Sequence, residues 1–190
     1  MQTIKIEGPW NKGSVLTKHT LASVCIGQNQ SGYPIFDTTR SEIGEALYQL
    51  KYKSDWSKVE FLANAIYEHI KADKNIHFII PMPASNPREK QPVSEIANIV
   101  AEKLGVPIFH NILSKTQNGQ SLKDLNRKED KIELLKDSFT VNKAITNDGK
   151  WNVLLIDDLY HTGATMEAAC KALQSYSKVN NVYVIALTWR

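Results

Sequence analysis

In the last quarter of the 190-residue chain, an uninterrupted apolar run is followed at once by two acidic residues. The run covers residues 153–156, and the acidic residues are Asp157 and Asp158. A uniformly apolar segment of this kind is typical of a central parallel strand that has both faces covered. In parallel α/β sheets, ligands bind at the carboxyl ends of the strands. The sequence therefore predicts an α/β fold with a ligand site beside the two carboxylates.

The segment after the acidic pair turns through residues 162–165 into a predicted helix. Successive backbone N–H groups and the positive helix terminus can surround a phosphate dianion at such a turn. Gly163 lets the backbone come close, and the hydroxyls of Thr162 and Thr165 can add hydrogen bonds. Carboxylates one turn away are suited to paired sugar hydroxyls, or to Mg²⁺ bound directly or through water. The combination suggests a phosphorylated sugar as the ligand.

From Ile76 onward, strand and helix patterns alternate, as expected for a parallel sheet with crossover helices. Pro92 starts one helix well, because its missing N–H is one that the first turn leaves unpaired, and Gly105 ends that helix. Residues 114–136 are polar and charged with little periodicity, which predicts a long loop or a loop carrying a short helix. Strands are predicted at residues 77–81, 107–113, 139–141, 153–157 and 182–187.

The first 70 residues have a different pattern. Residues 3–6 and 14–26 are rich in β-branched residues and flank a dense turn signal, which predicts a small antiparallel element. A helix is predicted behind Ser41 and a longer one behind Ser57, whose spacing to Glu60 has the form of a capping box. We therefore expect residues 1–70 to form an N-terminal hood of a β-hairpin and helices, and residues 71–190 to form the core domain.

Composition narrows the functional classes. Hydrophobic residues make up 42% and charged residues 23% of the chain, so folding throughout is expected. The net charge of +3 suits an anionic ligand but is too small to imply a nucleic-acid partner by itself. Cys25 and Cys170 lack the spacing of a zinc site or a disulfide framework. Neither a signal-peptide pattern nor an apolar stretch of roughly twenty residues occurs, so a cytoplasmic protein without membrane insertion is expected.

Strand, acidic pair and loop together resemble the signature of type I phosphoribosyltransferases, which binds 5-phosphoribosyl 1-pyrophosphate (PRPP). In that signature, apolar strand residues precede two acidic residues and a Thr-Gly-x-Thr loop. The resemblance narrows to the ComF-like branch, often labelled amidophosphoribosyltransferase-like, over roughly residues 38–190. It is carried by residues 47–53, by Pro81-Met82-Pro83, by Arg88 with Gln91, and by residues 120–123 with Arg127 and Phe139. The cysteine-rich zinc element that often begins these proteins is not found, and the glycine, aromatic residue and asparagine of their Arg-Gly-aromatic-Asn-Gln motif are absent.

The resemblance implies a Rossmann-like type I phosphoribosyltransferase fold, with a central mainly parallel sheet flanked by helices and a small N-terminal β/helix appendage. It also implies Mg²⁺-dependent transfer of a phosphoribosyl group from PRPP to a nitrogen nucleophile, with release of pyrophosphate. The protein's task in such a reaction is chiefly positioning and charge. A homodimer is a further expectation from the resemblance.

Site residues follow from the same resemblance. Asp157 and Asp158 are expected to be catalytic, holding the ribose hydroxyls and orienting the Mg²⁺ complex. The 5-phosphate is expected to contact Tyr160, Thr162, Gly163, Ala164 and Thr165. Pyrophosphate is expected beside Ala84, Ser85 and Arg88, whose guanidinium can donate two hydrogen bonds to one phosphate. Lys115, Lys123 and Arg127 belong to an expected lid that would neutralise the leaving group, although a solvated charged loop is the alternative for each.

His161 stands where the family more often has Thr or Asp, at a position that can lie near the incoming base. Its imidazole could accept a proton from the nucleophile at neutral pH, or it could be only a neighbour of the phosphate. The other four histidines share no ligand spacing and receive no role.

Two other functions stay open. A binding or regulatory module could use PRPP as a signal, since a fold does not fix a function. A nucleic-acid-associated protein is the other alternative, because ComF-like proteins are linked to DNA uptake in competent bacteria. The acceptor substrate is not disclosed by the sequence, because it depends on the hood and the loops.

Overall fold

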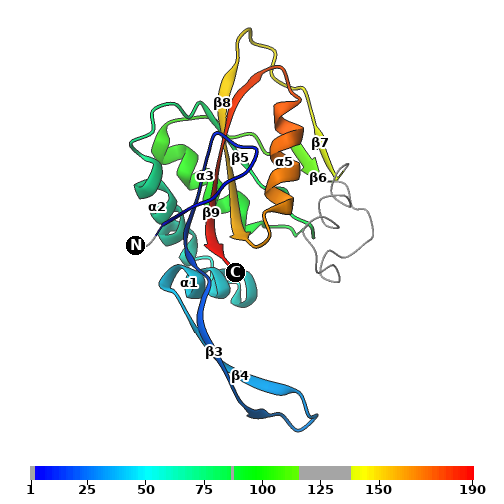
Figure 1. Ribbon diagram of the computed structural model, residues 1–190. Coiled ribbons are helices and arrows are strands. Elements are labelled where there is room, and N and C mark those ends of the chain that lie inside the picture. Colours follow the sequence, from blue (N-terminus) through cyan, green and yellow to red (C-terminus); the bar gives the residue numbers. More distant parts are fainter. Residues whose placement is uncertain (1–2, 87, 116–137) are drawn as a thin grey trace.

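A computed structural model of the chain describes residues 3–86, 88–115 and 138–190. Its centre is a five-stranded sheet in the order β1-β2-β9-β8-β5 (Figure 1). The four strands after β1 run parallel to their neighbours, and β1 pairs antiparallel with β2. The strands are β1 (Ile4–Lys5), β2 (Lys12–Lys18), β5 (Phe78–Pro81), β8 (Trp151–Tyr160) and β9 (Val179–Trp189).

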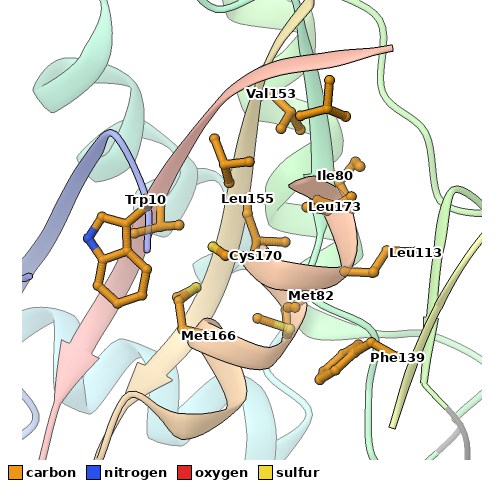
Figure 2. Packing of buried hydrophobic residues seen from close by; sticks show 14 of the residues in the cluster. Trp10, Ile80, Met82, Leu113, Phe139, Val153, Leu155, Met166, Cys170 and Leu173 are labelled. Carbon is orange, nitrogen blue, oxygen red and sulfur yellow. The ribbon is translucent and has the colours of Figure 1, made fainter. Parts of the chain in front are cut away.

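Helices cover both faces of this sheet. On one face, α1 (Glu42–Lys53), α2 (Lys58–Ile70) and α3 (Pro92–Leu104) share a buried cluster with Leu154 and Ile156 of β8. On the other face, α5 (Ala164–Gln174) packs against the intervening residues of the same strand. Figure 2 shows Val153 and Leu155 beside side chains of α5. The predicted class, an α/β fold with a central mainly parallel sheet flanked by helices, is confirmed.

A second, two-stranded sheet lies against the α5 face. It pairs β6 (Leu113–Lys115) with β7 (Phe139–Val141) in antiparallel fashion, and Leu113 and Phe139 are buried there. The strand expected at residues 107–113 is wrong in its bounds, because only Ile108 forms an isolated bridge to Ile79 and the strand begins at Leu113. Pro107, which has no N–H to donate, contributes only its carbonyl to β5.

The strand expected at residues 14–26 is divided in two at His19. Its first part belongs to β2, which joins the central sheet, and Val15 and Leu16 there are fully buried on opposite faces. Its second part is β3 (Thr20–Gln28), which pairs with β4 (Pro34–Arg40) in a hairpin that projects from the body (Figure 1). The division into residues 1–70 and 71–190 stays a prediction, and within residues 1–70 the hairpin is the part that projects.

The helix ends test the capping predictions. Ser41 caps α1 as expected, with its side chain accepting a hydrogen bond from Gly44 N at 3.0 Å. The capping box at Ser57 is wrong, because the Ser57 hydroxyl donates to Asp55 and makes no cap bond to α2. Pro92 and Gly105 bound α3 as predicted. None of the described helices is both long and apolar enough to cross a membrane.

Candidate functional site

A pocket of 330 Å³ lies at the carboxyl ends of β5 and β8. Its walls come from the end of α1, the segment between β5 and α3, the end of β6, the end of β8 and the start of α5. This is the sheet edge where the parallel topology places ligands. It is lined by Lys51, Met82, Pro83, Ala84, Ser85, Asn86, Arg88, Gln91, Pro92, Val93, Lys115, Asp157, Asp158, Leu159 and Thr165.

The two carboxylates of β8 have different environments. Asp157 Oδ1 accepts a hydrogen bond from Asp158 N at 2.8 Å, which fixes one side chain against the next peptide. Burial, together with the negative charge of Asp158, raises the pKa of Asp157 to about 7. Because burial disfavours the charged form of a carboxyl group, Asp157 can hold or release a proton near neutral pH.

Asp158 is paired with a cation from α1. Lys51 Nζ lies 2.7 Å from Asp158 Oδ2, and both side chains are mostly buried. Burial acts to lower the pKa of Lys51, but the charge of Asp158 and the hydrogen bond to it outweigh burial and raise that pKa. On the neighbouring strand β9, Thr188 Oγ1 donates to the Asp158 carbonyl at 3.1 Å, and His19 Nδ1 lies 3.2 Å from the same hydroxyl. Asp158 is therefore held at both its side chain and its main chain.

Two further cations, Lys115 and Arg88, line the pocket. Lys115 Nζ donates to Ser85 Oγ at 2.7 Å, and burial lowers the pKa of Lys115. Arg88 Nη1 donates to the Lys51 carbonyl at 3.2 Å, so the guanidinium is attached to the end of α1. Three cationic side chains from three different segments thus surround the same space as the acidic pair.

The loop before α5 has the backbone of a close-approach turn. Gly163 lies at the N-terminal end of α5 with φ of 82°. A Cβ atom added there would lie 2.6 Å from the hydroxyl of Tyr160, which no relaxed contact allows. Glycine is therefore needed at residue 163 for both its conformation and its lack of a side chain.

Several of the residues predicted to contact the 5-phosphate are not among those that line the pocket. Thr165 faces it, whereas Tyr160 packs edge-on against Trp10, with ring centroids 6.4 Å apart. Ala164 is buried in the core and His161 is exposed. Contact of the 5-phosphate with Thr162, Gly163 and their neighbours stays a prediction. Lys123 and Arg127 lie outside the described residues.

Lys51 is the site residue that sequence reasoning missed. In the sequence, residues 47–53 carry the family resemblance but no site prediction. A local signal does exist, since Leu47, four residues earlier on the same helical face, is buried. That spacing places Lys51 beside the core, but nothing near it in the sequence identifies Asp158 as its partner.

No group of three or more His, Cys, Asp or Glu side chains in the described part of the chain is arranged to hold a metal ion. Mg²⁺ in phosphate-binding sites usually takes one or two carboxylates from the protein, while the ligand's phosphates and water complete its coordination. The adjacent carboxylates of Asp157 and Asp158 fit that mode of binding.

Comparison with known proteins finds similar solved structures and one curated relative. No family model matches the chain. Among solved structures, it resembles adenine phosphoribosyltransferases from Saccharomyces cerevisiae and Giardia lamblia. The yeast structure has 16% identity and a TM-score of 0.46, over 88% of this chain and 85% of that one. The Giardia lamblia structure has 18% identity and a TM-score of 0.48, over 88% and 81%.

Competence protein ComFC of Bacillus subtilis (strain 168) is a curated relative of the chain. It is 29% identical over 167 residues, which cover 84% of this chain and 63% of ComFC. The match confirms the predicted likeness to ComF-like proteins. The chain spans less than two thirds of the length of that relative.

Proposed function

We propose that this chain is a phosphoribosyltransferase, which binds PRPP in the 330 Å³ pocket and transfers its phosphoribosyl group to a nitrogen nucleophile with release of pyrophosphate. One observation carries this proposal. Two adjacent carboxylates at the carboxyl end of a central parallel strand share a pocket with Lys51, Arg88 and Lys115. A ligand that suits both groups carries hydroxyls for the carboxylates and several anionic oxygens for the cations.

The ligand's parts can be assigned to different walls. The ribose hydroxyls would bind Asp157 and Asp158, and the 5-phosphate would bind the backbone N–H groups that open α5 around Gly163. Pyrophosphate would lie beside Ala84 and Ser85, between Arg88 and Lys115. A guanidinium supports this placement, because it can donate two hydrogen bonds to one phosphate.

Mg²⁺ is part of the proposal, with Asp157 and Asp158 as the residues that would hold it, directly or through water. Bound there with PRPP, the ion would supply positive charge that offsets the charge of the departing pyrophosphate. The chain's own contribution is positional: it holds the anomeric carbon near the acceptor and surrounds the leaving group with cations.

His161 is the candidate base that removes a proton from the acceptor nitrogen. Its exposed side chain lies three residues after the acidic pair. The imidazole would accept the proton that the nitrogen loses as the new bond forms. A homodimer is proposed from the family resemblance. A cytoplasmic location is proposed because Cys25 and Cys170 lack the spacing of a disulfide framework.

The test combines binding with turnover. Calorimetry should detect PRPP binding in the presence of Mg²⁺, and Asp158→Asn should weaken it at least tenfold because a ligand of the ribose and the metal is lost. Pyrophosphate release should then appear with one of a broad set of bases, amines and amides. Lack of PRPP binding by the folded wild-type protein would exclude the proposal.

A second candidate is a non-catalytic PRPP-binding protein. It is favoured by the engagement of Asp158, Arg88 and Lys115 with protein partners, since these groups must change partners to bind a ligand. PRPP binding without pyrophosphate release from any acceptor would select this candidate. The name of the ComFC relative keeps a role in DNA uptake as a further alternative, and salt-dependent binding of single-stranded DNA is the measurement that tests it.

A further inference from the structure

The ion pair between Lys51 and Asp158 occupies one of the two carboxylates on which the proposed ligand depends. Lys51 Nζ lies 2.7 Å from Asp158 Oδ2, and the exposed fractions of the two side chains are 26% and 14%. Both residues line the pocket. The contact joins residues 107 positions apart in the chain, so it is a feature of the tertiary structure and not of a local turn.

The backbone of Lys51 is held firmly, whereas its ammonium can contact different partners. The last turns of α1 are anchored by Leu47 and Leu50, which are buried, and by the hydrogen bond from Arg88 to the Lys51 carbonyl. The lysine side chain is a flexible four-carbon stem that ends in a compact charge. Its ammonium can therefore leave Asp158 and stay within the pocket without any movement of the helix.

A second cation cannot share Asp158 with Lys51 without a penalty. A Mg²⁺ ion bound to a carboxylate lies about 2.1 Å from its oxygen. Together with the ammonium on the same carboxylate, it would lie within about 6 Å of another positive charge in a partly desolvated site, where like charges repel strongly. Either Mg²⁺ or the Lys51 ammonium alone can neutralise the Asp158 carboxylate. When both bind it, their mutual repulsion offsets the gain.

We propose that Lys51 is a built-in competitor for the divalent cation at Asp158, so that Mg²⁺ and PRPP bind only by displacing its ammonium toward the ligand's anionic groups. This inference rests on the proposed function, because it assumes that PRPP and Mg²⁺ use the acidic pair. It assigns Lys51 a role in setting how much Mg²⁺ the site requires. In the absence of ligand, Lys51 keeps Asp158 paired.

The experiment measures the concentration of Mg²⁺ that half-saturates the thermal stabilisation of the protein by a fixed concentration of PRPP. Lys51→Met removes the ammonium and keeps an unbranched side chain of similar length. It should lower the half-saturating Mg²⁺ concentration at least fivefold. Lys53→Met is the matched control, since it makes the same change of charge two residues away on the same helix, at an exposed position, and should leave that concentration unchanged.

A double-mutant cycle separates this role from a structural one. On an Asp158→Asn background, Lys51→Met should have no further effect on the Mg²⁺ requirement, because Lys51 acts through Asp158. Lys51→Arg, which keeps the charge, should retain the wild-type requirement. If Lys51→Met fails to fold, Lys51→Gln provides the same comparison.

The outcomes distinguish this inference from the proposed function. Stabilisation of wild type and Lys53→Met by PRPP, with an unchanged or higher Mg²⁺ requirement in Lys51→Met, overturns the competitor role and leaves the proposed function standing. An equal fall of the half-saturating Mg²⁺ concentration in Lys53→Met also overturns the competitor role, since the effect would then come from net charge. If PRPP stabilises none of these proteins at any Mg²⁺ concentration, the proposed function fails and this inference fails with it.

Discussion

The ionisation of Asp157 affects the stability of the unliganded protein. Its pKa in the folded state is raised from 3.8 to about 7 by burial and by Asp158. The folded state therefore binds more protons than the unfolded state between these values, and the stability contributed by this group falls as pH rises from 4 to 7. Asp157→Asn, which cannot ionise, should consequently be more stable than wild type at pH 8.

The size of that gain can be bounded. Each unit of pKa corresponds to about 1.4 kcal/mol, so the free energy of unfolding should rise by at most about 4 kcal/mol at pH 8 and by less than about 1 kcal/mol at pH 4. Urea unfolding at both pH values measures the difference. Asp37→Asn on the exposed hairpin is the control for loss of a carboxylate. An equal gain at pH 4 and pH 8 would contradict the assignment of the raised pKa to Asp157.

The sequence predicts the acidic pair Asp157 and Asp158 but not Lys51, the cation that pairs with Asp158, and the difference has a physical reason. Residues 153–165 combine strand, carboxylates and helix start in one continuous segment, so local pattern alone indicates the site. Lys51 reaches Asp158 only because α1 packs on the sheet, and no spacing rule links residues so far apart. Tyr160 shows the same limit, since its packing against Trp10 depends on where the first turn of the chain lies.

At the scale of elements, prediction succeeded where one segment decides the outcome. The apolar run at residues 153–156 predicts the central strand β8, and Pro92 and Gly105 predict the two ends of α3. Prediction failed where a neighbouring residue or strand decides which hydrogen bonds a segment makes. Ser57 caps no helix because Asp55 takes its hydroxyl, and residues 14–26 divide because β9 pairs with only the first part.

The start of α5 gives a prediction at this scale. Gly163→Ala places an alanine in the left-handed backbone conformation of residue 163 and brings its Cβ against the Tyr160 hydroxyl. Gly105→Ala is a matched control, because Gly105 also has positive φ, 68°, but an added Cβ would meet nothing within 4 Å. We expect a loss of about 1 kcal/mol for Gly105→Ala and about 2–3 kcal/mol for Gly163→Ala in denaturant unfolding. Equal losses would show that the contact with Tyr160 relaxes freely.

For the whole molecule, the pocket unites segments that are distant in sequence. Lys51 lies in the last turn of α1, Arg88 precedes α3, Lys115 ends β6, and the acidic pair lies near the end of β8. A ligand that contacts all four therefore connects the helical cover on one face of the sheet with the small β6–β7 sheet on the other. Such a ligand should stabilise the global fold and not only the loop it touches.

Hydrogen exchange can measure this coupling. At PRPP and Mg²⁺ concentrations about 100 times the dissociation constant, stabilisation should reach about 2.7 kcal/mol. Amides of α1 and α3, as well as those that begin α5, should then exchange more slowly, because the ligand joins their segments. Protection confined to the start of α5 would mean that the ligand binds the phosphate loop alone. Protection of α1 that is lost in Asp158→Asn would instead place the end of α1 and the acidic pair in one ligand site.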